Sequence, residues 1–126
     1  MKTVVVDASF ILAYLLPDEV LSADALIKRF KAGQAVFFST QLLPFEVLNS
    51  LKNALKQKRI TAVQAGVLSR RFLEMEIELL PVKFEEVFEL AEKKNLTIYD
   101  AGYLWLARNK KVKLQTLDKQ LKKIAA

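Results

Sequence analysis

The chain has 126 residues, a length that suits one domain over 1–126, and 52% of them are hydrophobic, enough for a sizeable core. It contains no cysteine and no histidine, which excludes disulfides, thiolate metal sites and a histidine general base. Hydrolytic chemistry would need carboxylates, hydroxyls, lysines or an oxygen-bound metal, and oxygen ligands favour Mg²⁺ or Mn²⁺ over zinc. A net charge of +6 favours polyanionic partners such as nucleic acid, although solubility alone would also explain it.

The first forty residues alternate between apolar strands and helices. A β-branched run over 4–6 predicts a central parallel strand buried on both faces. Asp7 interrupts the apolar N-terminus and no small-residue cleavage site follows, so we interpret the segment as a strand and a helix over 8–16. No apolar run reaches the ~18 residues of a membrane span, and we expect a cytoplasmic protein. A second helix is predicted over 20–31 and a second strand over 35–38.

The middle of the chain is predicted to be mostly helical. A helix begins after Ser39 and Thr40, with Pro44 in its first turn, where proline is tolerated. Thr61 and Gln64 form a capping-box pattern, which predicts that the next helix starts there and reaches about residue 75.

Two of the predicted helices carry apolar residues at helical spacing, and we expect these stripes to face the core. The stripe of the helix that contains Pro44 consists of Phe45, Leu48, Leu51 and Leu55. The stripe of the helix after a third predicted strand, over 77–80, consists of Phe84, Val87, Phe88 and Ala91.

The last quarter repeats the alternation. Thr97 opens a helix that runs through Arg108, residues 112–116 form a fourth strand, and Asp118 starts a short last helix. Strands that alternate with helices along a whole chain predict an α/β fold, with a parallel sheet and helices on both faces.

Four acidic side chains stand where strands end or helices begin. Asp7 directly follows the first strand, Glu46 lies shortly after the second, and Asp118 lies two residues past the last. Asp100 is on the first turn of its helix and joins them if that helix points to the same edge. In an open α/β sheet, strand ends face one ligand-binding crevice. Four carboxylates there repel each other unless a cation offsets their charge, so the set predicts a divalent-metal site.

Each of these acids also has a simpler interpretation as a helix N-terminal residue. Asp7 and Asp118 fit the N-cap position, and Asp100 and Glu46 fit a first turn, where negative charge is favourable. Taken together in an oxygen-only chemistry, the four acids favour a site over capping alone. Three neighbours could orient a carboxylate or a water, or make ordinary turn hydrogen bonds: Ser9, Asn49 and Thr116.

Four segments occur in the order and at the spacing of a known family: VVVDASFILAYLLPDE, LLPFEVLNSL, LTIYDAGYLWLA and LQTLDKQL. On these segments the chain resembles the PIN domain and, within it, the VapC-type toxins of toxin–antitoxin pairs, over essentially its whole length. The resemblance implies a three-layer α/β/α fold with a short, mainly parallel sheet. One departure is Gly102, where related sequences often carry a larger residue, and close helix packing would explain it.

The resemblance also implies a function, a Mg²⁺- or Mn²⁺-dependent endoribonuclease that cleaves RNA. It implies a homodimer, and inhibition by a cognate VapB-like antitoxin that inserts a tail into the active-site groove. The residues that it assigns as catalytic and as metal ligands are Asp7, Glu46, Asp100 and Asp118. The residues that it assigns as supporting are Ser9, Asn49 and Thr116.

Other functions fit the acidic pattern less well. A catalytically silent PIN-like RNA-binding or regulatory module is the main alternative, but a binder of polyanions gains nothing from four clustered negative charges. A phosphoacceptor receiver domain would need an acidic neighbour beside Asp7, and a haloacid-dehalogenase-like phosphatase would need an aspartate where Ser9 stands. Cations that could contact an RNA backbone, and that also fit a solvated helix face, are Lys52, Lys56, Arg70 and Arg71.

Overall fold

A computed structural model describes residues 1–18 and 24–126, and it confirms the alternation of strands and helices. The strands in these residues are β1 (Lys2–Val6), β2 (Ala35–Thr40), β3 (Glu78–Leu80) and β4 (Lys113–Gln115). The helices in them are α1 (Ala8–Leu15), α2 (Asp24–Lys31), α3 (Leu43–Lys56), α4 (Ala62–Leu73), α5 (Phe84–Lys94), α6 (Ile98–Lys110) and α7 (Lys119–Ala125). The start of the helix predicted over 20–31 lies outside the described residues.

The four strands form one parallel sheet in the order β3-β2-β1-β4. β1 is interior, since Val5 pairs with Phe38 of β2 on one side and with Leu114 of β4 on the other. The chain builds from β1 to β2 and β3 and then returns to the opposite side of β1 with β4. The strand order therefore reverses between β1 and β4, and open α/β sheets form their ligand crevice at the carboxyl ends of such a switch point.

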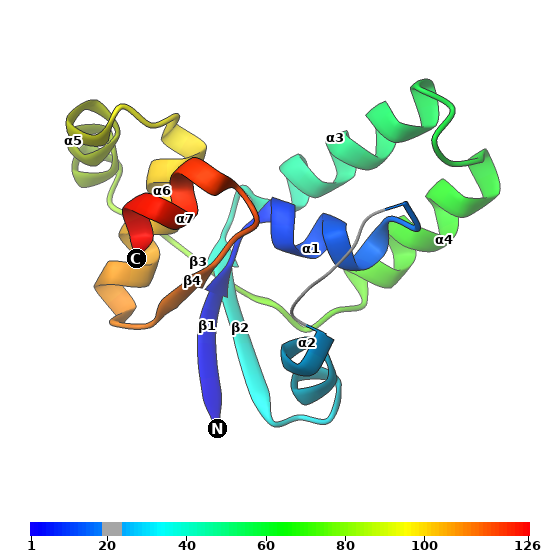
Figure 1. Cartoon of the computed structure of the whole chain (residues 1–126), viewed down its shortest axis with the longest axis horizontal. Coiled ribbons are helices and arrows are strands. Elements are labelled where there is room, and N and C mark those ends of the chain that lie inside the picture. Colours follow the sequence, from blue (N-terminus) through cyan, green and yellow to red (C-terminus); the bar gives the residue numbers. More distant parts are fainter. Residues whose placement is uncertain (19–23) are drawn as a thin grey trace.

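Helices cover both faces of the sheet. In Figure 1, α1 to α4 lie on one side of the strands and α5 to α7 lie on the other. α6 packs against β1, β2 and β4, and α2 packs against β2. This arrangement confirms the predicted three-layer α/β/α fold. No helix in the part of the chain that the structure describes is long and apolar enough to cross a membrane.

The core is centred on β1 and β2. The three valines at 4–6 are fully buried, as their β-branched run predicts for a central strand. Phe37 on β2 is also fully buried. Its ring stacks on Phe30 with centroids 4.2 Å apart and meets the edge of the Phe10 ring at 5.9 Å. These contacts hold α1 and α2 against the sheet and so fix the position of the β1 carboxyl end.

β2 extends two residues further than predicted. Ser39 and Thr40 continue the ladder to β3, and α3 begins only at Leu43. The Ser39 hydroxyl donates to the carbonyl oxygen of Val6 at 2.6 Å, and Thr40 Oγ1 accepts from the Leu42 backbone N–H at 3.3 Å. Because both hydroxyls find partners at the end of the sheet, this pair completes a strand and does not cap a helix.

The two predicted apolar stripes are only partly correct. The side chains that α3 buries are Leu43, Val47, Leu51 and Ala54. Phe45, by contrast, is 74% exposed. On α5, Val87 and Ala91 are buried, but Phe84 and Phe88 are 68% and 60% exposed. Both helices carry two adjacent apolar faces, so helical spacing alone does not tell which face packs against the core.

Gly102 lies inside α6, but close packing does not require a glycine there. A Cβ at this position would meet Thr40 Cγ2 at 3.7 Å, an ordinary van der Waals contact. Because glycine in a helix interior costs about 0.5–1 kcal/mol relative to alanine, Gly102→Ala should raise the free energy of unfolding by about that amount in chemical denaturation. Gly33→Ala is the opposing control and should lower it, because Gly33 has a φ of +74°. A destabilised Gly102→Ala would contradict this account.

Candidate metal-binding active site

Asp7 lies at the carboxyl end of β1, beside the switch point, and is 3% exposed. Its Oδ1 accepts hydrogen bonds from the Phe10 backbone N–H at 3.0 Å and from the Ser9 hydroxyl at 2.7 Å, so it caps α1. Its Oδ2 accepts from the hydroxyl of Thr116, the residue that follows β4. This carboxylate therefore caps a helix and also lies at the switch point of the sheet.

Ser9 and Thr116 connect Asp7 to Asp118. Ser9 Oγ lies 3.3 Å from Thr116 Oγ1 and accepts from the Leu117 backbone N–H at 2.9 Å. Thr116 Oγ1 accepts from the Asp118 backbone N–H at 3.1 Å. Asp118 caps α7 with its side chain and remains exposed. The two hydroxyls thus hold the turn that carries Asp118 against the end of β1.

Glu46, in the first turn of α3, is oriented by Tyr103, a residue that the sequence pattern did not single out. Tyr103 is 1% exposed on α6, and its hydroxyl donates to Glu46 Oε1 at 2.8 Å. It stands three residues after Asp100, which places both on one face of α6. An aromatic residue with a polar tip, one turn beyond a candidate acid, was the signal available in the sequence.

Asp100 lies at the same edge of the sheet as the other acids. α6 leads into β4, which is parallel to β1, so the first turn of α6 lies at the carboxyl ends of the strands. Thr97 caps this helix, and its Oγ1 accepts from the Asp100 backbone N–H at 3.1 Å. The helix therefore points in the direction that the site requires.

Three of the four carboxylates have a raised pKa. Burial is the largest cause of the raised pKa of Asp7, Glu46 and Asp100. The charge of Asp118 adds to the rise in pKa of Asp7 and Asp100, and the charges of Asp100 and Asp7 add to that of Glu46. The hydroxyl and N–H donors around Asp7, and the Tyr103 hydroxyl at Glu46, oppose the rise. The structure therefore brings the four acids together electrostatically.

The side-chain oxygens of these four acids suit a hard divalent cation as ligands, because all of them are anionic. Within residues 1–18 and 24–126, no three acidic side chains are already gathered into a ligand cluster. Glu46, Asp100 and Asp118 are partly or fully exposed, however, so their side chains retain room to turn. In chemistry and in charge the set fits a divalent cation, which would offset the repulsion between the carboxylates.

In EDTA, the wild type should lose stability relative to Asp100→Asn as the pH rises. Asp100 has a folded pKa above its unfolded value. Its contribution to stability is therefore fully present below the unfolded pKa, about 4, and is lost as the pH rises through the folded pKa. Chemical denaturation between about pH 4 and pH 8 measures the difference, and added Mg²⁺ should restore the wild type selectively. A difference that does not change with pH would contradict the raised pKa.

Tyr103→Phe should weaken metal binding or activity by about 10- to 100-fold, as is usual when a partner that orients a ligand is lost. Without the Tyr103 hydroxyl the pKa of Glu46 should rise further, so the acid limb of the pH–rate profile should move to higher pH. Tyr14→Phe is the matched control, because it removes a tyrosine hydroxyl from the last turn of α1. The centroid of the Tyr14 ring lies 4.7 Å from Lys31 Nζ. An unmoved acid limb would show that Tyr103 only fills space.

Asn49 lies one turn after Glu46 on α3 and is exposed. Both residues line an open hollow of about 480 Å³, together with Phe45, Ser50 and Tyr99. In the described part of the chain, no hydrogen bond joins the Asn49 amide to the acids, so its supporting role stays a prediction.

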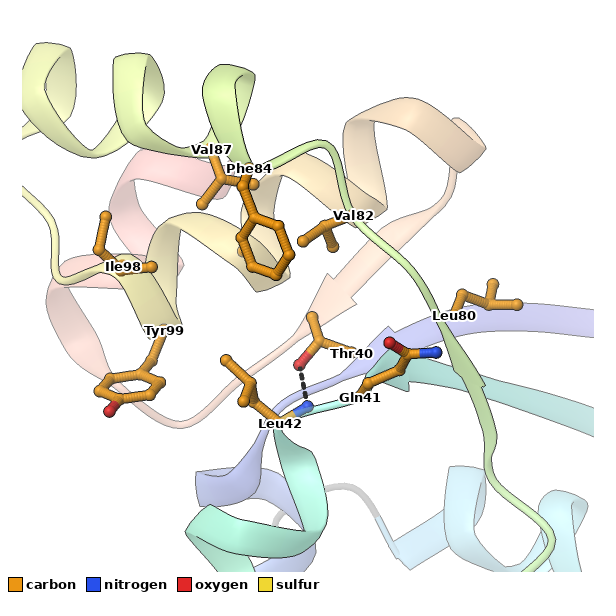
Figure 2. A pocket seen from close by; sticks show the side chains of 10 residues that line it. Thr40, Gln41, Leu42, Leu80, Val82, Phe84, Val87, Ile98 and Tyr99 are labelled. Carbon is orange, nitrogen blue, oxygen red and sulfur yellow. Dashed lines mark hydrogen bonds between the residues drawn. The ribbon is translucent and has the colours of Figure 1, made fainter.

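A second, apolar pocket of about 100 Å³ borders the site (Figure 2). Val82 and Phe84 lie on one side of it, and Leu42 lies on the other, where its backbone N–H bonds to Thr40. Tyr99, at the start of α6, lines both this pocket and the hollow that contains Glu46. Glu46 is therefore flanked by the aromatic side chains of Phe45 and Tyr99.

Known proteins resemble this chain in sequence and in fold. The family model of the PIN domain matches residues 4–126. Ribonuclease VapC3 of Pyrobaculum aerophilum is 31% identical over 121 residues, an alignment that covers 93% of this chain and 90% of the relative. Two solved structures are also similar. PAE2754 of Pyrobaculum aerophilum has a TM-score of 0.74 at 24% identity, over 95% of this chain and 77% of its own. VapC20 of Mycobacterium tuberculosis, a toxin that cleaves the sarcin–ricin loop, has a TM-score of 0.65 at 16% identity, over 96% and 94%.

Proposed function

Because this chain belongs to the PIN domain family, we propose that it is a metal-dependent endoribonuclease and the toxin of a type II toxin–antitoxin system. The observation that carries the proposal is the placement of four acids at the carboxyl ends of the parallel strands of a basic protein. The relative named ribonuclease VapC3 supports RNA as the substrate. We treat residues 1–126 as one nuclease domain, since the larger hydrophobic cluster contains buried residues from β1 to α7.

Asp7, Asp100 and Asp118 are the proposed ligands of Mg²⁺ or Mn²⁺, with Glu46 as a ligand directly or through water. Such an ion would supply Lewis-acid chemistry there, since it would lower the pKa of a water and offset negative charge on the phosphate. This chemistry replaces the histidine base that the chain lacks.

The protein's own groups have defined tasks in this proposal. Ser9 and Thr116 donate to Asp7 and so favour its charged form despite its burial. Tyr103 holds Oε1 of Glu46, which leaves Oε2 to accept a proton from the attacking water. The raised pKa of Glu46 makes its carboxylate a stronger proton acceptor than an unperturbed glutamate.

Cleavage of single-stranded RNA tests the proposal, with purified wild type and Asp100→Asn in Mg²⁺ or in EDTA. We expect the wild type to cleave the RNA in Mg²⁺ but not in EDTA, and Asp100→Asn to cleave it much less in Mg²⁺. Equal cleavage by both proteins, or cleavage in EDTA, would contradict metal-dependent catalysis at these acids. Metal-independent RNA binding without cleavage would instead identify the silent RNA-binding module.

The proposal includes a VapB-like antitoxin, a homodimer and a cytoplasmic location. Exposed Phe84 and Phe88 on α5 supply apolar surface that a protein partner could cover. Sedimentation of the purified chain tests the dimer, and co-expression with the product of a neighbouring small gene tests the antitoxin. A monomer at all concentrations would remove the homodimer from the proposal.

A further inference from the structure

Two aromatic side chains stand exposed beside the acids. Phe45 directly precedes Glu46 and is 74% exposed, and Tyr99 directly precedes Asp100 and is 52% exposed. They come from α3 and α6, yet they line the same hollow of about 480 Å³, and Glu46 lines it with them. Large apolar side chains that are exposed next to one another indicate a binding surface for a ligand or a macromolecule.

We propose that Phe45 and Tyr99 form a subsite that stacks an unpaired RNA base next to the carboxylate centre, an inference that rests on the proposed ribonuclease function. Aromatic side chains bind nucleobases of any sequence by stacking, because every base has a π-face. The remaining lining residues, Asn49 and Ser50, supply donors and acceptors for the edge of a base. Tyr99 points its hydroxyl away from Phe84 and Val82 (Figure 2), and it also lines the hollow that contains Glu46.

The charges along α3 favour RNA over a protein as the occupant. Phe45, Asn49, Lys52 and Lys56 are exposed and follow at i, i+4, i+7 and i+11, so they share one face of the helix. This face extends about 16 Å away from the acids, with its two cations at the far end. A chain that stacks a base at Phe45 would carry its phosphates towards these lysines, whereas an apolar peptide would gain nothing from them.

The subsite implies that the protein selects unpaired nucleotides, since a base inside a duplex has no free face to stack. It places the recognised base immediately beside the acids, because Phe45 and Glu46 are neighbours in the same helix turn. The sequence of that base should matter little, and its freedom from pairing should matter more.

The test uses a short single-stranded RNA that contains 2-aminopurine, whose fluorescence is quenched by stacking. The probe is bound in Mg²⁺ to the Asp7→Asn variant of this chain, which we expect not to cut it, with and without the double change Phe45→Ala and Tyr99→Ala. The double change should abolish the quenching and weaken binding by about 5- to 150-fold. Tyr99→Phe keeps the ring and should retain the quenching. Val63→Ala removes another exposed apolar side chain, on α4, and should leave quenching and affinity unchanged.

The outcomes separate this inference from the proposed function. Unchanged quenching and affinity in the double variant would overturn the subsite, whether or not the wild type cuts RNA. A double variant that binds RNA normally but associates less with itself in sedimentation would also overturn it and make the surface a protein interface. If the wild type fails to cut RNA while quenching follows the two aromatic residues, the nuclease function fails and the subsite stands. An unchanged unfolding midpoint shows that each variant is folded.

Discussion

Asp7→Asn is expected to reduce RNA cleavage by about 10³-fold or more while leaving the metal-free protein at least as stable as the wild type. The loss follows because several kcal/mol of charge stabilisation by a bound cation depend on this ligand, and each 1.36 kcal/mol is a factor of ten in rate. Asp7 is the most buried of the four acids, and it joins the ends of β1 and β4 through Thr116. No neighbouring carboxylate can replace it there.

The stability should not fall, because asparagine can occupy the same network. Its Oδ1 can accept from the Phe10 N–H and the Ser9 hydroxyl, as the aspartate does, and its amide can donate to Thr116 Oγ1. Burial raises the pKa of the Asp7 carboxyl, so its ionised form is disfavoured in the folded protein. Removing that charge should stabilise the protein by about 0.5–2 kcal/mol without metal.

Two measurements check this pair of effects, single-turnover cleavage in Mg²⁺ and urea denaturation in EDTA. Asp24→Asn is the matched control, since Asp24 is an exposed acid in the first turn of α2, and it should change neither value by much. An inactive Asp7→Asn that is also strongly destabilised would mean that Asp7 serves the fold and not the chemistry.

The edge of the sheet that carries the site was predictable from the sequence. Apolar runs that end at Asp7 and near Thr116 mark strand ends, and strands alternating with helices are parallel, so those ends must meet. The local roles were also predictable, since Asp7 and Asp118 do cap helices. Capping and a role in the site are compatible for Asp7, because its carboxylate has two oxygens. Oδ1 caps α1, and Oδ2 accepts from Thr116.

Two features were not predictable, and each depends on tertiary packing. The direction of α6, by contrast, follows once β4 is parallel to β1, because the helix must then begin at the carboxyl ends of the strands. The partnership of Tyr103 with Glu46 spans 57 positions of sequence, and no local pattern encodes such a contact. The exposure of Phe45 depends on which of two apolar faces of α3 meets the core. These two features are the ones that orient Glu46 and flank it with aromatic surface.

Phe37→Ala is expected to lower the free energy of unfolding by about 3–5 kcal/mol, the usual effect of truncating a fully buried aromatic residue. Phe37 is 0% exposed on β2 and contacts the rings of Phe30 and Phe10, so a cavity there would loosen α1 and α2 against the sheet together. Urea denaturation in EDTA gives the size of the loss. A loss below about 1 kcal/mol would mean that the neighbouring rings collapse into the space.

Phe45→Ala is the matched comparison, because it removes the same type of side chain from the exposed apolar face of α3. Phe45 is 74% exposed, so its loss should change the free energy of unfolding by less than about 0.5 kcal/mol. If Phe45 contributes to RNA binding as proposed, the two variants should differ in opposite ways. At temperatures where both are folded, Phe37→Ala should bind RNA normally with a lower unfolding midpoint, and Phe45→Ala should bind RNA weakly with an unchanged midpoint. Equal effects of both changes on stability would show that Phe45 packs against the core.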